Sequence, residues 1–234
     1  MSLPNKMRRA PLLCYVTDRR LLSQVDAEAA PQNLLNKMEA AAFAGVDWIQ
    51  IREKDLSGRD CARLAQEALR RVANANANAN ATDPTRVRLL INDRLDVALS
   101  ERAGGVHLGE QGLPTAEAKH LAGSRADGKN FLIGVSCHSL EAATVAQRNG
   151  ADYIFFGPVF ATPSKVVYGA PQGLKSLAEV CAAISIPVLA IGGVNLENAA
   201  DCLRAGAAGL AAIRLFQEAK DPASLVRALR DLAL

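Results

Sequence analysis

Side chains that could bind an anion gather in a short polar stretch near residue 50. The sequence Gln50-Ile51-Arg52-Glu53-Lys54 ends an apolar run, and alternation along an extended strand points Gln50, Arg52 and Lys54 to one side. Arginine offers phosphate oxygens a planar fork and lysine offers a mobile positive charge, so this set could clamp an anion. A solvated charged loop would show the same pattern.

A second polar pair could hold a metal ion. Asn92 and Asp93 end another apolar run. Mg²⁺ prefers carboxylates together with the phosphate oxygens of a substrate, so this pair could form part of a magnesium site. Asp93 could equally cap the helix expected after it, since Asp is a frequent N-cap residue.

Two histidines call for different interpretations. His107 lies within an apolar run and is expected to be a packed, hydrogen-bonded residue. His138 follows the run that contains Ser136 and directly precedes an expected helix, which favours acid/base chemistry. A neighbour of a helix cap would occupy the same position.

The last third of the chain contains a long loop, residues 157–173, and a pair of glycines. The loop offers two hydroxyls and a cation from Thr162, Ser164 and Lys165, and loops of this length are usually functional. Gly192-Gly193 ends one apolar run, and Ile213-Arg214 ends the next. Paired loops of this kind are typical of the phosphate site of an α/β barrel, built from backbone N–H groups.

These polar residues all follow short apolar runs that predict buried parallel strands. The expected strands are residues 12–17, 48–52, 88–92, 105–108, 131–136, 153–157, 188–191 and 209–213. The expected helices are residues 32–44, 58–72, 94–102, 115–122, 139–149, 174–184, 196–205 and 222–234. Eight such cycles in 234 residues predict a single-domain (β/α)8 TIM barrel over residues 1–234, with its site at the carboxyl ends of the strands.

Local signals support several of these boundaries. Ser139 and Asn195 are placed to cap helices, and Gly45, Gly150 and Gly206 are placed to end them. The exception to the cycle is residues 74–84, where an Asn-Ala repeat predicts a mobile loop without a core to join. This loop precedes a strand, so it belongs to the barrel face opposite the site.

Composition excludes several classes of partner. The net charge of +3 is too small to indicate binding to nucleic acid or to a membrane surface, and no segment is long enough to span a bilayer. The apolar run at residues 10–16 is broken at once by polar residues, which indicates a first strand and no signal peptide. Five widely spaced cysteines indicate free thiols in a reducing compartment, so we expect a cytoplasmic protein. The oligomeric state is left open, with a homo-oligomer among the options.

Together the strand ends resemble the family of thiamine-phosphate synthase and its sister enzyme, the thiazole tautomerase. The resemblance runs over nearly the whole chain, from Tyr15 to Ile213. Its most specific segments are Gln50-Ile51-Arg52-Glu53-Lys54, Ile91-Asn92-Asp93, Gly105-Val106-His107-Leu108-Gly109, Gly157-Pro158-Val159-Phe160 with Thr162 and Lys165, and Ile191-Gly192-Gly193.

The resemblance implies a transferase that couples a phosphorylated pyrimidine to a phosphorylated thiazole, with Mg²⁺ as cofactor. It implies that the diphosphate of the pyrimidine is held by Gln50, Arg52, Lys54, Asn92 and Lys165, and that Asp93 ligates Mg²⁺. It implies that the reacting pair is lined by Ser136, Thr162 and Ser164, and that the thiazole phosphate is seated by Gly173, Gly192, Gly193 and the backbone of Ile213.

The chain departs from the family pattern at two positions. Gly112 stands where the family usually has a second magnesium carboxylate, and Glu110 is the candidate substitute. Arg214 stands where the synthase has a Ser, and it too could bind phosphate. Two alternatives stay open: a tautomerase with His138 as acid/base, and a non-catalytic barrel that binds thiamine precursors.

Overall fold

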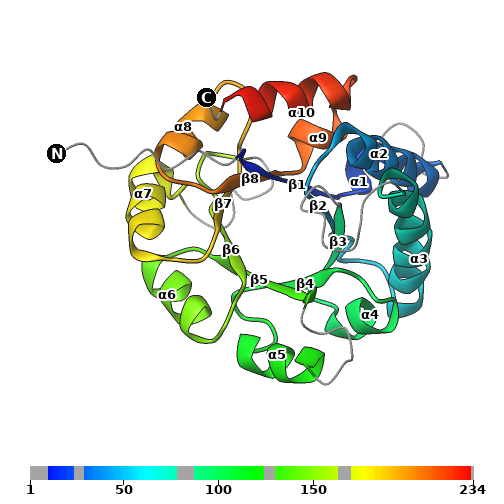
Figure 1. Ribbon diagram of the computed structural model, residues 1–234, viewed down its shortest axis with the longest axis horizontal. Helices are drawn as coiled ribbons and strands as arrows, with labels where there is room; N and C mark the ends of the chain where they lie inside the picture. The colour runs from blue at the N-terminus through cyan, green and yellow to red at the C-terminus, as the bar shows by residue number, and fades with distance from the viewer. Residues whose placement is uncertain (1–9, 24–28, 78–86, 124–129, 163–169, 233–234) are drawn as a thin grey trace.

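A computed structural model describes residues 10–23, 29–77, 87–123, 130–162 and 170–232. Eight parallel strands close into one barrel in the order β1 to β8, and helices surround it (Figure 1). The strands are β1 Leu12–Val16, β2 Trp48–Ile51, β3 Arg88–Asn92, β4 Gly105–Leu108, β5 Leu132–Cys137, β6 Tyr153–Phe156, β7 Val188–Ile191 and β8 Gly209–Ala212. The predicted (β/α)8 TIM barrel is confirmed, with each predicted strand present.

The helices follow the strands as predicted, with two additions. They are α1 Arg20–Ser23, α2 Ala30–Ala44, α3 Gly58–Ala75, α4 Leu95–Ser100, α5 Thr115–Gly123, α6 Leu140–Arg148, α7 Gly173–Ala183, α8 Ala199–Arg204, α9 Arg214–Gln217 and α10 Pro222–Asp231. The sequence predicted neither α1 nor α9, because a single helical turn is too short to show a hydrophobic period.

The local signals for helix ends are mostly confirmed. Gly45, Gly150 and Gly206 follow their helices with φ of 90°, 87° and 102°, a left-handed backbone that glycine adopts without steric cost. The Ser139 hydroxyl caps α6 by accepting the Ala142 N–H at 3.0 Å. Asn195 does not cap α8, contrary to the prediction: its side chain accepts the N–H groups of Glu197 and Asn198, and the helix begins only at Ala199.

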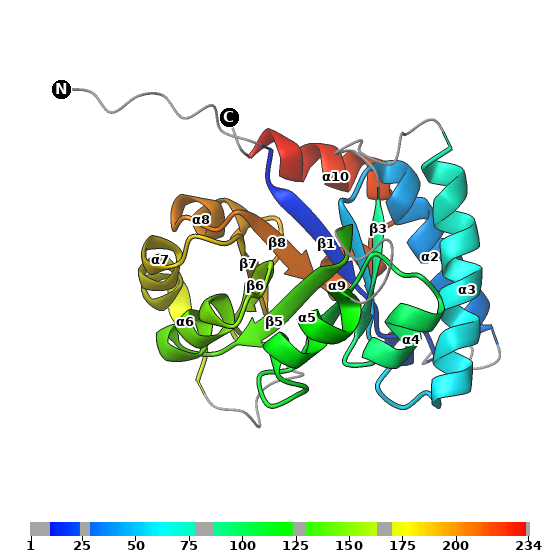
Figure 2. The same cartoon turned by 60° about the horizontal axis from the view of Figure 1, so that its bottom comes forward.

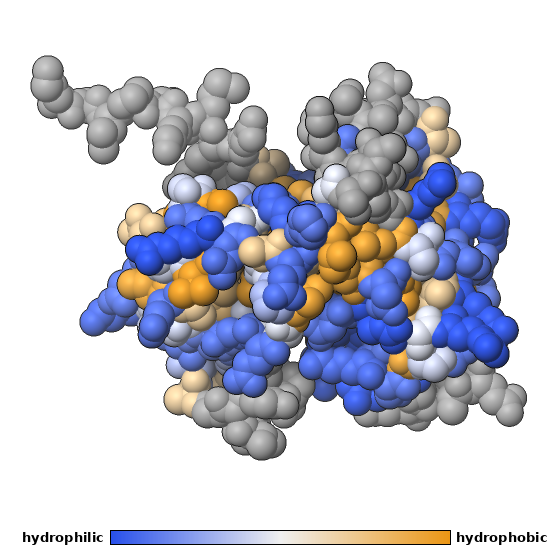
Figure 3. Space-filling view, turned by 90° about the horizontal axis from the view of Figure 1, so that it is seen from below, coloured by the Kyte–Doolittle hydropathy of each residue, from blue (hydrophilic) through white to orange (hydrophobic). Residues whose placement is uncertain are grey.

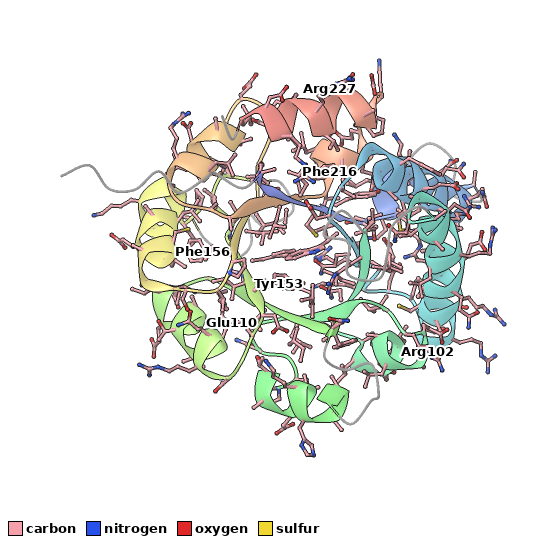
Figure 4. The ribbon with its side chains drawn as sticks, viewed as in Figure 1. Arg102, Glu110, Tyr153, Phe156, Phe216 and Arg227 are labelled. Atoms are coloured by element: carbon pink, nitrogen blue, oxygen red, sulfur yellow. The ribbon has the colours of Figure 1, made fainter. Side chains whose placement is uncertain are left out.

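Apolar side chains form two layers because residues alternate along each strand. The interior of the barrel is filled by Cys14, Val16, Trp48, Leu90, Tyr153, Phe155, Leu189 and Ala211. A larger cluster lies between the strands and the helices. Strand β6 shows the alternation in Figure 4, where Tyr153 lies inside the ring of strands and Phe156 lies on the side of the helices.

On the face where the strands begin, side chains hold the backbone in place through hydrogen bonds. Helix α10 lies across the start of β1 (Figure 2), where the Arg230 guanidinium bonds the Pro11 and Gly45 carbonyls and the Asp47 carboxylate. On the same face, the Asn76 side chain bonds both the N–H and the carbonyl of Val87, each at 2.9 Å. The predicted loop at residues 74–84 therefore begins as the last turn of α3, and its residues 78–84 lie outside the described part.

On the face seen in Figure 3, hydrophilic side chains alternate with patches of hydrophobic ones. Among the residues that the structure describes, the exposed large apolar ones are Phe43, Leu121, Leu140, Val145 and Leu196. Within the described residues, no helix is both long and apolar enough to cross a bilayer.

Candidate active site

A chain of polar side chains connects the ends of β2, β3 and β4 at the mouth of the barrel. The Gln50 Nε2 donates to Asn92 Oδ1 at 2.8 Å, and the Asn92 Nδ2 donates to Asp93 Oδ2 at 2.7 Å. The other oxygen of Asp93 accepts the Gly109 N–H at 2.7 Å. Asp93 therefore joins two strand ends and does not cap α4, where no side-chain cap bond is present.

The Asp93 carboxylate fixes the direction of the hydrogen bonds in this row of side chains. An ionised Asp93 only accepts hydrogen bonds, so Asn92 must present its amide nitrogen to Asp93 and its oxygen to Gln50. Gln50 must then use its nitrogen, which leaves its oxygen for another donor. Gln50 is 1% exposed, and its Oε1 is the buried side-chain atom without a hydrogen-bond partner among the described residues. A buried acceptor of this kind calls for a donor from a ligand or from an ordered water.

Glu53 connects the loops that follow β1 and β2, next to this row of side chains. Its carboxylate accepts the Thr17 hydroxyl at 2.6 Å and the Arg19 N–H at 3.0 Å, and it pairs with the Arg19 guanidinium at 3.1 Å. Thr17 in turn accepts the Arg52 N–H at 3.0 Å. No role was predicted for Glu53 from the sequence, although it stands between Arg52 and Lys54. A carboxylate set between exposed cations at a strand end was the one available signal.

His107 lies below the mouth and bonds inward-facing residues of β5 and β6. Its Nε2 is 2.9 Å from the Ser136 hydroxyl, and its Nδ1 is 3.1 Å from the Tyr153 hydroxyl. Burial lowers the pKa of His107 from 6.5 to about 3, and the positive charge of Arg52 lowers it too. The ring is therefore neutral at pH 7. His107 is a packed, hydrogen-bonded residue, as the sequence predicted.

His138 and Glu110 form a pair at the ends of β4 and β5. One oxygen of Glu110 accepts the His138 N–H at 2.9 Å and lies 2.7 Å from the His138 Nδ1. Both side chains are 39% exposed. The structure thus brings together the candidate acid/base and the candidate second metal ligand, which the sequence had assigned to separate roles.

The loops after β6 and β7 approach each other too closely for side chains. A β-carbon on Gly192 would lie 2.5 Å from Pro158, and one on Gly193 would lie 2.7 Å from the Ala161 carbonyl. Both glycines have positive φ, 93° and 67°. The Phe160 N–H donates to the Gly192 carbonyl at 3.0 Å, so this backbone is held in place. Neither glycine N–H donates a backbone hydrogen bond within the described part of the chain, which suits an anion-binding loop.

The remaining predicted residues lie around the same mouth or outside the described part. Gly173 begins α7, and its N–H donates to the Val159 carbonyl at 3.1 Å. Ile213 directly precedes α9, and Arg214 pairs with Glu218 on that helix at 3.2 Å. Thr162 is half-buried. Ser164 and Lys165 lie outside the described residues.

The described residues contain no group of three His, Cys, Asp or Glu side chains that could hold a metal ion. Asp93 stands at the mouth as a single carboxylate, with one hydrogen bond to each of its oxygens. Each oxygen keeps a second lone pair, so Asp93 can still ligate a cation. A β-carbon on Gly112 would lie 3.6 Å from Asp93 Oδ1, so Gly112 faces this carboxylate without adding a ligand.

Comparison with known proteins gives consistent matches. A family model described as thiamine monophosphate synthase matches residues 16–216. A putative thiamine-phosphate synthase from Geobacter sulfurreducens is 45% identical over 217 residues, which cover 93% of this chain and 92% of that protein. A thiamine-phosphate synthase from Chloroflexus aurantiacus is 39% identical over 221 residues, covering 94% and 95%. The solved thiamine phosphate pyrophosphorylase from Pyrococcus furiosus superposes with a TM-score of 0.76 at 30% identity, covering 97% and 98%.

Proposed function

This chain belongs to the thiamine monophosphate synthase family, and from that premise we propose that it forms thiamine phosphate. In this reaction, the methylene carbon of hydroxymethylpyrimidine diphosphate loses pyrophosphate and bonds to the ring nitrogen of a thiazole phosphate. The observation that carries the proposal is the pair of anion-binding ends at one barrel mouth. The polar ends of β2 and β3 lie across the barrel from the glycines after β7 (Figure 1).

The β2 end suits the diphosphate of the pyrimidine substrate. Arg52 and Lys54 are the cations there, and Glu53 ties the backbone between them to β1. We propose that they hold the diphosphate together with Asn92 and with Lys165. Because negative charge grows on pyrophosphate as it leaves, cations already in position lower the barrier.

Gln50 suits a different part of the same substrate. Its Nε2 gives one of its two N–H groups to Asn92, and its Oε1 is an acceptor without a partner among the described residues. A fully ionised diphosphate has only acceptors, so it gives this oxygen no donor. The exocyclic amino group of the pyrimidine is a donor, and we propose that Gln50 accepts it. This contact is proposed beside the diphosphate role that the resemblance implies, which the second N–H of the Gln50 amide can still serve.

The residues at the mouth fit a magnesium ion held by one protein carboxylate. Mg²⁺ is commonly bound through one or two carboxylates plus substrate phosphates and water. Asp93 would supply the carboxylate, and its bonds to Asn92 and Gly109 fix its orientation, as outer partners of metal ligands do. When bound, Mg²⁺ would neutralise charge on the diphosphate. Glu110 remains a candidate ligand, at the cost of its contacts with His138.

The β7 and β8 end suits the phosphate of the thiazole substrate. The N–H groups of Gly192 and Gly193 lie in left-handed turns, and the start of α9 adds the backbone after Ile213. We propose that these groups seat the phosphate and that Arg214 adds charge from the surface. The Gly173 N–H is already bonded to the Val159 carbonyl, so we propose that Gly173 contributes space beside the phosphate and not a donor. Between the two ends, Ser136, Thr162, Ser164 and His138 would line the reacting pair.

The relatives bear the name of the synthase, so neither the tautomerase nor the non-catalytic barrel is favoured.

The described residues contain five free cysteines and no disulfide. Free thiols suit a reducing compartment, and we propose a cytoplasmic location.

The test of the proposed function is formation of thiamine phosphate from the two phosphorylated precursors, with and without Mg²⁺. We expect turnover that depends on Mg²⁺. Arg52→Ala should lower kcat/KM by about 100-fold, the loss of a charged contact of about 3 kcal/mol in the transition state. Arg59→Ala removes an exposed arginine in the first turn of α3 and is the matched control. Unchanged coupling by Arg52→Ala would refute the diphosphate assignment.

A further inference from the structure

The contacts of His107 assign a direction to the hydrogen bonds beneath the mouth. A neutral imidazole has one nitrogen that donates and one that accepts. His107 contacts a hydroxyl at each nitrogen, Tyr153 at Nδ1 and Ser136 at Nε2. Two arrangements are therefore available. Either Tyr153 donates to Nδ1 and Nε2–H donates to Ser136, or Nδ1–H donates to Tyr153 and Ser136 donates to Nε2.

The buried Tyr153 hydroxyl, at the inner end of these hydrogen bonds, decides between the two arrangements. Tyr153 is 1% exposed, and its hydroxyl has no second hydrogen-bond partner in the part of the chain described by the structure. Burial raises the pKa of Tyr153 well above its ordinary value, so the hydroxyl keeps its proton. If His107 donated to Tyr153, this proton would lack an acceptor, which costs more than an unused lone pair. Tyr153 therefore donates to Nδ1.

Packing holds both rings in this arrangement. The His107 ring lies 4.1 Å from the Phe155 ring, and the Tyr153 ring lies 4.5 Å from that of Trp48, measured between centroids. Gly134 leaves the space that Tyr153 fills, because a β-carbon there would lie 2.0 Å from its Cζ. Tyr153 consequently crosses the interior of the barrel (Figure 4). The rings cannot turn away without disturbing the core.

We propose that His107 and Tyr153 are positioning residues that make Ser136 a hydrogen-bond donor toward the substrate. Since Nε2–H occupies a lone pair of the Ser136 oxygen, the serine proton is free to point into the mouth. Ser136 is half-buried at the end of β5, so its hydroxyl can reach a bound molecule. The same arrangement stops His107 from taking the serine proton, so Ser136 is no nucleophile. This inference rests on the proposed function for the identity of the substrate.

The tautomer itself can be measured without any substrate. Ring ¹⁵N chemical shifts distinguish a protonated nitrogen from a bare one, and the chain has only three histidines. His107→Gln identifies the His107 signals by their loss. We expect Nε2 protonated and Nδ1 bare at pH 7. The opposite tautomer overturns the proposal, whether or not the protein makes thiamine phosphate.

The consequence for catalysis is tested by removing the Tyr153 hydroxyl. Tyr153→Phe keeps the ring and should lower kcat roughly tenfold, the effect of one hydrogen bond, with little change in KM. Tyr15→Phe is the matched control: it removes another buried hydroxyl, bonded to Gln217 at 3.0 Å, and should leave kcat unchanged. In a Ser136→Ala background, Tyr153→Phe should have no further effect on kcat.

The alternative outcomes are distinct. Full kcat in Tyr153→Phe, or an equal loss with and without Ser136, overturns the positioning role. His107→Gln supplies an amide donor in place of Nε2–H and should retain more kcat than His107→Leu. If the wild type makes no thiamine phosphate but shows the Nε2–H tautomer, the proposed function fails and the hydrogen-bond direction stands.

Discussion

The neutral state of His107 predicts a loss of stability in mild acid. Its pKa is about 3 in the folded protein, against 6.5 for an ordinary histidine. Between these values the unfolded chain binds the proton and the folded protein does not, so stability falls as the pH falls from about 6.5 toward 3. Between pH 7 and pH 5 the loss is about 2 kcal/mol, at 1.36 kcal/mol per unit below pH 6.5. This loss of stability depends little on the pKa of His107 in the folded protein, because pH 5 is well above that pKa.

Unfolding by urea measures this loss. Trp48 is the only tryptophan and packs against Tyr153, so its fluorescence reports the barrel interior. Wild-type protein and His107→Gln would be unfolded at pH 7 and pH 5. We expect the wild type to lose about 2 kcal/mol more than the variant, or about 4–8 °C in Tm at this size. His120→Gln changes an exposed histidine on α5 and should behave as the wild type. An equal loss in His107→Gln would refute the reasoning.

Three further substitutions test the loops at the mouth, one of them as a matched control. Glu53→Gln removes the buried charge that pairs with Arg19, and should lower the free energy of unfolding in urea by about 2–3 kcal/mol. The loss should be no larger, because Arg19 keeps its contact with Asp55. Asp55→Asn removes only an exposed partner of Arg19 and should cost less than about 1 kcal/mol. Equal losses in Glu53→Gln and Asp55→Asn would contradict the role of Glu53 in connecting the loops. Gly112→Asp places a second carboxylate beside Asp93 and should lower the Mg²⁺ concentration needed for half-maximal rate. Unchanged Mg²⁺ affinity by calorimetry would show that position 112 does not face the metal.

The barrel was predictable because its signals are local and repeated. Each strand is a short apolar run, and Gly45, Gly150 and Gly206 end helices at comparable points of three cycles. Errors arose where the signal was short or ambiguous. Asn195 has the residue type of a cap but forms a turn before α8.

The position of the polar residues at one mouth of the barrel was predictable from the sequence, and their mutual contacts were not. Parallel strands bring their carboxyl ends together, so polar residues at strand ends had to meet at one mouth. Which of them pair depends on barrel register and side-chain direction, which spacing does not encode. The sequence therefore left open whether Asp93 caps a helix, and it did not pair Glu110 with His138.

Two hydrogen-bond chains at this mouth have opposite directions, and each is fixed by an end that cannot reverse. The Asp93 carboxylate can only accept, so its chain ends in the free acceptor of Gln50. The buried Tyr153 hydroxyl must donate, so its chain ends in the free donor of Ser136. A substrate that offers both an amino donor and phosphate acceptors complements both ends at once. We propose that this order of donors and acceptors contributes to substrate selection beside the charges of Arg52 and Lys54.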